Sequence, residues 1–140
     1  MYDPFGSALE LVTQLRSGAL SAVQVMQETL DRIDAVNPQL NAIVALRDRD
    51  VLMAEAAAAD QAKSRGALHG LPMAIKDLAN VKGVASTQGS PMFRDFVPQQ
   101  DELFVARLRA AGAIFIGKTN TPEFGLGSHT FNPVYGATRN

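Results

Sequence analysis

Two short apolar runs constrain the fold of this chain more than any other feature. The first, "LPMAI", lies between Gly70 and Asp77, and the second, "AIFIG", covers residues 113–117. Each has the length and the branched or aromatic content of a buried strand. An amphipathic helical pattern at residues 101–112 precedes the second run. A strand, a crossover that contains a helix, and another strand predict a parallel pair in an α/β sheet.

The first third of the chain is predicted to be helical. Apolar residues recur at helical spacing in three segments, at residues 8–16, 21–36 and 47–65. Ser21 and Gln24 have the spacing of a capping box, which would open the second helix. We expect Gly18 to end the first helix, Pro38 to end the second and Gly66 to cap the third.

A fourth helix is expected between the two strands. Asp101 is its predicted cap, and Gly112 its predicted end. Phe104, Val105 and Leu108 are spaced to face inward. The segments that follow the two strands, residues 80–100 and 120–140, are rich in turn-forming residues. Loops at the carboxyl ends of parallel strands are where sites usually form, so we expect a site there.

Composition excludes several classes of function. The chain has 140 residues, a net charge of −1 and no cysteine. The near-neutral charge gives no reason to expect nucleic acid or an anionic membrane as a direct partner. The absence of cysteine excludes disulfides and thiol chemistry, and fits a cytoplasmic location. No apolar run approaches the ~18 residues that a membrane span needs.

One eight-residue stretch matches a nucleotide-binding pattern. Residues 112–119, "GAIFIGKT", have the P-loop form of a glycine, four residues, and Gly-Lys-Thr. A phosphate-binding loop must bend, whereas Ile114, Phe115 and Ile116 favour an extended strand. We therefore interpret Gly112 as a helix end and Gly117-Lys118 as part of a strand.

Lys76 follows the first apolar run directly, and the residues around it leave three interpretations open. Such a lysine can extend to solvent from the end of a strand. It can form a structural ion pair with Asp77 or another carboxylate. It can also be a catalytic base, because burial lowers the pKa of an amine and lets it take a proton near neutral pH.

Several motifs, in order, resemble the amidase signature family. They are "GLPMAIKD", "STQGSPMFRDF" and the run from "DELFVARLRAAG" to "YGATRN", which fall within residues 70–140. The segment "LSAVQVMQETLDRIDAVNPQLNAIV" also looks like the N-terminal helical region of that family. The resemblance implies an α/β fold, with N-terminal helices followed by the start of a mixed, largely parallel sheet covered by helices. It places a helical region at residues 1–66 and the first part of the α/β core at residues 67–140, together one incomplete domain.

The resemblance also implies a chemistry. Members of the family hydrolyse amides with a Ser–cis-Ser–Lys triad, and "AIKD" puts Lys76 at the position of the lysine. Lys76 would deprotonate a bridging serine, which activates the nucleophilic serine for acyl transfer. The loop that contains Phe124, Gly125, Leu126 and Gly127 lies beside the acyl pocket in the family, so these residues are candidate substrate-binding residues.

One part of the family pattern is absent from these residues. Both serines belong to a "GGSSGG"-type segment that normally follows "YGATRN", and the chain ends at Asn140. We therefore expect the 140 residues alone to be inactive and to be the N-terminal part of a longer amidase. Two other hypotheses stay open. One is an amidotransferase subunit that releases ammonia from glutamine for a partner acting on charged tRNA. The other is a non-catalytic interaction module.

The expectation about metals and cofactors comes from the histidines, and the expectation about partners comes from the resemblance. His69 and His129 are far apart in sequence and have no metal-ligand spacing, so we expect no metal and no cofactor. His69 is expected in a loop, and His129 is expected in a loop that could reach the pocket. The expected partner is a small-molecule amide substrate, and the longer protein could form a homodimer.

Overall fold

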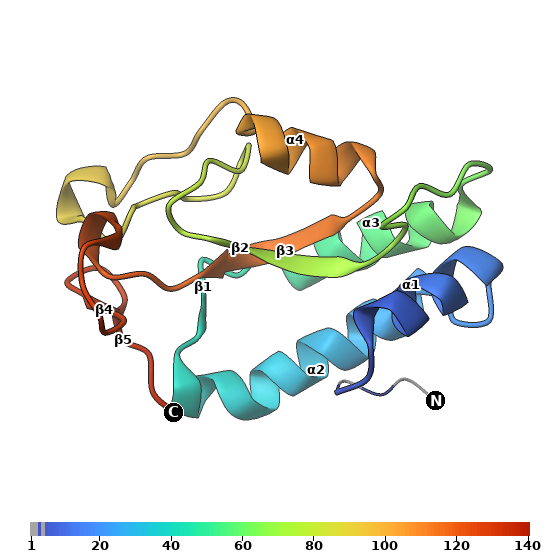
Figure 1. Ribbon diagram of the computed structural model, residues 1–140, viewed down its shortest axis with the longest axis horizontal. Coiled ribbons are helices and arrows are strands. Elements are labelled where there is room, and N and C mark those ends of the chain that lie inside the picture. Colours follow the sequence, from blue (N-terminus) through green and yellow to red (C-terminus); the bar gives the residue numbers. More distant parts are fainter. Residues whose placement is uncertain (1–2, 4) are drawn as a thin grey trace.

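The computed structural model describes residue 3 and residues 5–140, and arranges them in layers about a small sheet. Figure 1 shows α1 and α2 on one face of the sheet and α4 on the other, and α3 packs into the same core cluster as α1 and α2. The α-helices are α1 Ala8–Ser17, α2 Ala22–Leu40, α3 Arg49–Gln61 and α4 Leu103–Ala110, with short 3-10 helices at Pro91–Phe93 and Glu123–Gly125. The strands are β1 Ile43–Val44, β2 Pro72–Lys76, β3 Ile114–Thr119, β4 Phe131–Asn132 and β5 Gly136–Ala137.

The predicted parallel pair is confirmed. β2 pairs with β3 in parallel, with Pro72 opposite Ile114 and Lys76 opposite Thr119, and the register shifts between Met73 and Ala74. The sequence prediction missed β1, which pairs antiparallel with β3 and makes the strand order β1-β3-β2. Two residues carry too little periodicity to mark a strand, so β1 is defined by its partner rather than by its own pattern.

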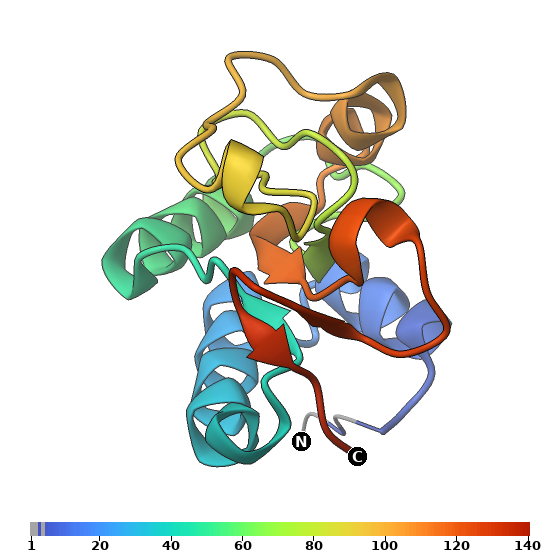
Figure 2. The same cartoon turned by 90° about the vertical axis from the view of Figure 1, so that its left-hand side faces the viewer.

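The side chains of β3 point alternately to the two faces of the sheet, and so take part in two separate core clusters. Ile114 and Ile116 pack with the helical face formed by α1, α2 and α3. Phe115 faces the other way, where Ile75 and Val105 of α4 pack against it. Successive side chains of a strand point to opposite faces, so one strand joins both layers. The carboxyl ends of β2 and β3 face the viewer in Figure 2, where the loops that follow them gather.

The first two helices begin as predicted, but only the first ends where the sequence predicted. Ser21 accepts a hydrogen bond from the Gln24 amide, and Gly18 ends α1 with a φ of 78°. The predicted end at Pro38 is wrong, because α2 continues to Leu40. Proline breaks a helix by removing one amide donor. Here only the last turn is affected, and Asn41 caps it in the left-handed conformation.

The third helix is shorter than predicted. It begins after Asp48, whose carboxylate accepts two backbone N–H groups, and it ends at Gln61 rather than at residue 65. The chain leaves the helix because Arg65 donates to the Leu15 and Arg16 carbonyls at the end of α1. Gly66 is therefore not a helix cap. A Cβ there would lie 2.3 Å from the Ala111 carbonyl oxygen, so glycine permits a close backbone approach.

The fourth helix corrects two further expectations. Asp101 does not cap α4, because its carboxylate binds the Arg109 guanidinium at 2.6 and 2.9 Å. Glu102 occupies the cap position without a side-chain capping bond, because its carboxylate accepts the Asn80 amide at 3.2 Å instead. Val105 is buried as predicted, but Phe104 is exposed, because this short helix buries only a narrow stripe.

The predicted loop at residues 120–140 contains more structure than its composition indicated. Its β4–β5 hairpin is held by Asn120, whose side-chain amide donates to the Gly136 carbonyl and the Thr138 hydroxyl. The Arg139 amide donates to the Leu40 carbonyl, so the C-terminus lies beside the end of α2 (Figure 1).

Candidate active site

The candidate site lies at the carboxyl edge of the β2–β3 pair. Lys76 is the last residue of β2, opposite Thr119, and its side chain is exposed. Two backbone hydrogen bonds hold it in place. The Lys76 carbonyl accepts from the Ala79 amide at 3.1 Å, and the next residue, Asp77, donates its amide to the Thr119 carbonyl at 2.9 Å. The structure thus presents an exposed amine from a fixed backbone.

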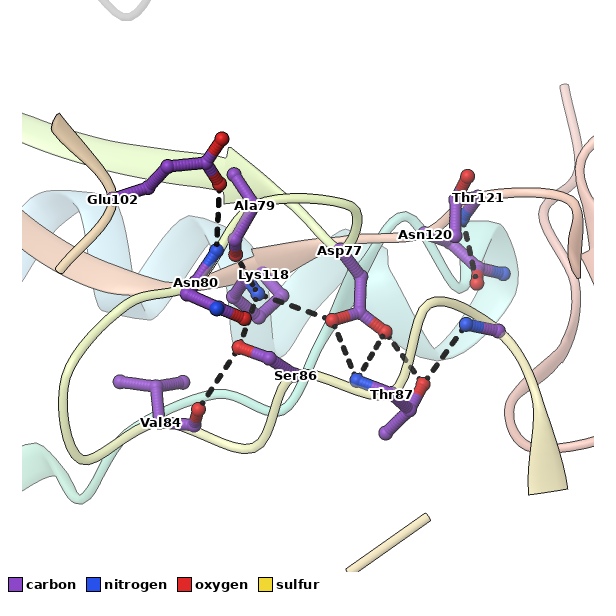
Figure 3. A network of polar contacts seen from close by, with 11 residues as sticks. Asp77, Ala79, Asn80, Val84, Ser86, Thr87, Glu102, Lys118, Asn120 and Thr121 are labelled. Atoms are coloured by element: carbon purple, nitrogen blue, oxygen red, sulfur yellow. Dashed lines mark hydrogen bonds and ion pairs between the residues drawn. The ribbon is translucent and has the colours of Figure 1, made fainter. Parts of the chain in front are cut away.

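A fully buried ion pair lies directly behind Lys76. Lys118 and Asp77 have no exposed side-chain surface, and the Lys118 Nζ lies 3.1 Å from the Asp77 Oδ1. The Lys118 Nζ also donates to the Ala79 carbonyl at 2.7 Å and to the Ser86 Oγ at 2.8 Å. Figure 3 shows the ammonium enclosed by these acceptors. The carboxylate of Asp77 is therefore paired with Lys118, not with Lys76.

Asp77 also fixes the loop that follows β2. Its carboxylate accepts the Thr87 amide at 3.0 Å and the Thr87 hydroxyl at 2.6 Å (Figure 3). The Thr87 Oγ1 in turn accepts the Gly89 amide at 3.0 Å. Burial lowers the pKa of the Lys118 amine, and the charge of Asp77 opposes that shift. Burial also raises the pKa of the Tyr135 hydroxyl, and the nearby charge of Asp77 adds to the effect.

The sequence prediction treated Lys118 only as part of a strand and missed this network. The sequence did contain an indication of it, because a lysine interrupts an otherwise apolar strand immediately before the strand ends. The parallel register places it opposite Ile75, next to the "KD" pair. A buried lysine needs a buried acceptor, and Asp77 was the nearest carboxylate on the predicted neighbouring strand.

The loop of predicted substrate-binding residues lies beside the turn that follows Lys76. Phe124 adopts a φ of 52° and Gly125 a φ of 73°. The Phe124 amide donates to the Gln88 carbonyl at 2.8 Å. A Cβ on Gly125 would lie 2.9 Å from the Leu78 side chain, two residues from Lys76. The structure therefore brings Phe124 and Gly125 to the same edge as Lys76.

Apolar side chains form a wall on this loop. The rings of Phe124 and Phe93 meet edge to face, with centroids 6.3 Å apart, and Phe93 contacts Phe96 in the same way at 6.2 Å. Leu78 and Leu126 are exposed, as is part of Phe124. The rest of the loop, with Gly127, lines a cavity of about 350 Å³ next to His129.

The two histidines lie in different places. His69 precedes β2, at the end of the strand remote from Lys76, and is 4% exposed, and its Nε2 has no hydrogen-bond partner among the residues that the structure describes. Burial lowers the pKa of His69, with a smaller contribution from Arg65, while Asp60 opposes it. Within the described part of the chain, no group of three histidine or acidic side chains is placed to hold a metal ion.

The P-loop match falls on a strand, as interpreted from the sequence. Ile114–Thr119 forms β3, so its backbone is extended where a phosphate loop would curl. Both glycines serve packing. A Cβ on Gly112 would lie 2.9 Å from the His69 Cα, and one on Gly117 would lie 2.8 Å from the Ala45 carbonyl oxygen.

No helix among the described residues is long and apolar enough to cross a membrane.

Known proteins resemble this chain in sequence and in fold. The amidase family model matches residues 24–140. An indoleacetamide hydrolase of Bradyrhizobium diazoefficiens is 42% identical over 138 residues, covering 96% of this chain and 26% of that protein. A glutamyl-tRNA(Gln) amidotransferase subunit of Streptomyces avermitilis is 38% identical over 138 residues, covering 96% of this chain and 27% of that protein. The solved peptide amidase from Stenotrophomonas maltophilia matches with a TM-score of 0.87 at 32% identity, covering 98% of this chain and 30% of that chain. The chain spans about a quarter of the length of these curated relatives.

Proposed function

The chain belongs to the amidase family, and from this premise we propose that the complete gene product containing it hydrolyses a small-molecule amide with Lys76 as the base. The predicted family and α/β fold class are confirmed by the family match and by the structural likeness to a solved amidase. One observation carries the proposal for Lys76. It is an exposed amine on a fixed backbone, at the strand edge where the loop of Phe124 and Gly125 also lies.

The chemistry requires a neutral amine and a hydroxyl nucleophile. Lys76 would take the proton of a bridging serine, and that serine would take the proton of the nucleophilic serine as its oxygen bonds to the amide carbon. The carbon–nitrogen bond then breaks, and the departing nitrogen receives a proton returned through the same pair. Water repeats the sequence and releases the acid. The 140 residues contain no Gly-Gly-Ser-Ser-Gly-Gly segment, so we propose that they do not hydrolyse amides by themselves.

The test is Lys76→Ala in the complete gene product, assayed on p-nitroanilides and on primary amides with ammonia release. Removal of a general base costs about 10²–10⁴-fold in turnover, so kcat should fall by about 100-fold or more. Lys63→Ala is the matched control, because Lys63 is also exposed but lies after α3, away from this edge. Turnover by Lys76→Ala equal to that of Lys63→Ala would refute the role of Lys76.

The relative from Streptomyces avermitilis favours a second candidate, an amidotransferase subunit that takes ammonia from glutamine. Glutamine supplied with and without other amides separates the two activities. Turnover confined to glutamine would favour the amidotransferase, and turnover on other amides the hydrolase. A complete gene product without a Gly/Ser-rich segment after Asn140 would favour the third hypothesis, an interaction module. The domain division at residue 66, the homodimer and the cytoplasmic location stay predictions.

A further inference from the structure

Burying the ion pair of Lys118 and Asp77 carries a large desolvation free energy. Removing two charges from water costs several kcal/mol per ion, and apolar residues of similar volume often serve stability equally well. Here both side chains are fully buried, and all three protons of the Lys118 ammonium find acceptors. The position of the pair, directly behind the candidate base, indicates a role other than stability.

The pair holds the turn that begins at Lys76. Alternation along a strand sends the side chain of Asp77 inward while that of Lys76 points outward. Lys118 binds the Asp77 carboxylate and the Ala79 carbonyl, and the Ala79 amide binds the Lys76 carbonyl. The turn at residues 76–79 is therefore held at its second and fourth residues by one ammonium. Hydrogen bonds join the same ion pair to the loop after β2, because Thr87 donates to the Asp77 carboxylate and Ser86 accepts from the Lys118 ammonium.

We propose that Lys118 and Asp77 are positioning residues that fix the turn at residues 76–79 and thereby aim the Lys76 amine at the reacting hydroxyl. The proposal rests on the function proposed above for Lys76. The strand pairing holds this segment on one side, because Lys76 lies opposite Thr119 of β3 and the Asp77 amide donates to the Thr119 carbonyl. The ion pair fixes the other side, because Ala79 cannot move outward without breaking its bonds to Lys118 and Lys76. A lysine side chain has four rotatable bonds, so a fixed backbone is the first requirement for aiming its amine.

The double variant Asp77→Asn/Lys118→Met in the complete gene product tests this proposal. It removes both charges together, so no unpaired charge stays buried, and it keeps the volume of the side chains. Loss of alignment of about 1 Å costs about 10²-fold, so kcat should fall by about 10- to 100-fold while KM changes by less than about threefold. Circular dichroism and the thermal midpoint show whether the variant folds. If it does not fold, Asp77→Asn alone is measured in the same way, because the amide keeps an acceptor oxygen for Lys118 and the buried amine can lose its proton.

Arg109→Met is the matched control. It breaks the ion pair with Asp101, which lies in the same layer, and the side-chain hydrogen bonds of Arg109 go to Asp101 and not to the turn at residues 76–79. The proposal predicts wild-type kcat for this control. A folded double variant with the kcat of Arg109→Met would overturn the positioning role. A rise in KM as large as the fall in kcat would overturn it too. Lys76→Ala is assayed alongside. If it retains turnover, the proposed function fails. If it is inactive while the double variant is fully active, only the positioning role fails.

Discussion

Replacement of Gly117 by alanine tests how closely the chain segments around β3 approach one another. The backbone of Gly117 is extended, so alanine meets no left-handed strain. Its Cβ would lie 2.8 Å from the Ala45 carbonyl oxygen and 2.9 Å from the Leu46 Cα, where ordinary contact begins at 3.4 Å. Residues 45 and 46 must therefore move by about half an ångström. Both contacts are backbone, so no side-chain rotation relieves them.

The cost follows from that geometry. Overpacking costs about 1–3 kcal/mol, and rigid backbone neighbours favour the upper half of that range. Alanine recovers about 0.5–1 kcal/mol relative to glycine in a strand, which leaves a net loss of about 1–2.5 kcal/mol. With an unfolding entropy of about 2.1 cal/mol/K per residue over these residues, the thermal midpoint should fall by about 3–9 °C.

Urea unfolding followed by circular dichroism measures the loss, and hydrogen exchange locates it. The Arg47 amide donates to the Ile116 carbonyl at 2.9 Å, so the displaced segment should lose protection at Arg47. Gly83→Ala is the control, because a Cβ there meets nothing within 4 Å and only its φ of 76° is unfavourable. It should cost about 1–2 kcal/mol with Arg47 still protected. A Gly117→Ala variant within about 0.5 kcal/mol of wild type, with Arg47 protected, would refute this reasoning.

Two further predictions concern the amino end of α2 and the buried histidine. The Asp60 carboxylate accepts the Ala22 amide at 2.6 Å and the Val23 amide at 3.1 Å. Asp60→Ala should lower the free energy of unfolding by about 1.5–3 kcal/mol in urea titrations, and a negligible loss would contradict a capping role. Burial, and then Arg65, lower the pKa of His69 in the folded state, so the unfolded chain binds more protons. Stability should be complete above the ordinary value of 6.5 and fall as the pH drops below it. His69→Leu should flatten this dependence, and an unchanged slope between pH 7 and 5 would refute it.

Local signals predicted the parts of the fold that local physics decides. Ser21 caps α2 and Gly18 ends α1, because each acts on its own neighbours. The apolar runs became β2 and β3, since a continuous apolar run indicates a strand covered on both faces of a sheet. The wrong predictions concern residues whose structure is set by contacts with segments distant in the sequence. Arg65 leaves the helical path for carbonyls on α1, and β1 exists only because β3 lies beside it.

The candidate site shows the same division. The "AIKD" motif placed Lys76 at a strand end, which is a local property. The pairing of Asp77 with Lys118 required the register of two strands about 40 residues apart, which a pattern in either strand does not contain. The left-handed φ of Phe124 was also beyond local prediction. Non-glycine residues rarely adopt it, and here a hydrogen bond to the Gln88 carbonyl accompanies it.

The position of β3 in the chain sets an order for folding during synthesis. The helical face of the core contains Leu15, Met26 and Ala56, but it is completed by Ile114 and Ile116. The ribosome must add about 58 residues between Ala56 and Ile114, which takes about 3–12 s at 5–20 residues per second. Throughout that interval α1, α2 and α3 lack the strand that supplies Ile114 and Ile116. The nascent helices therefore keep part of their apolar faces exposed until β3 has been made.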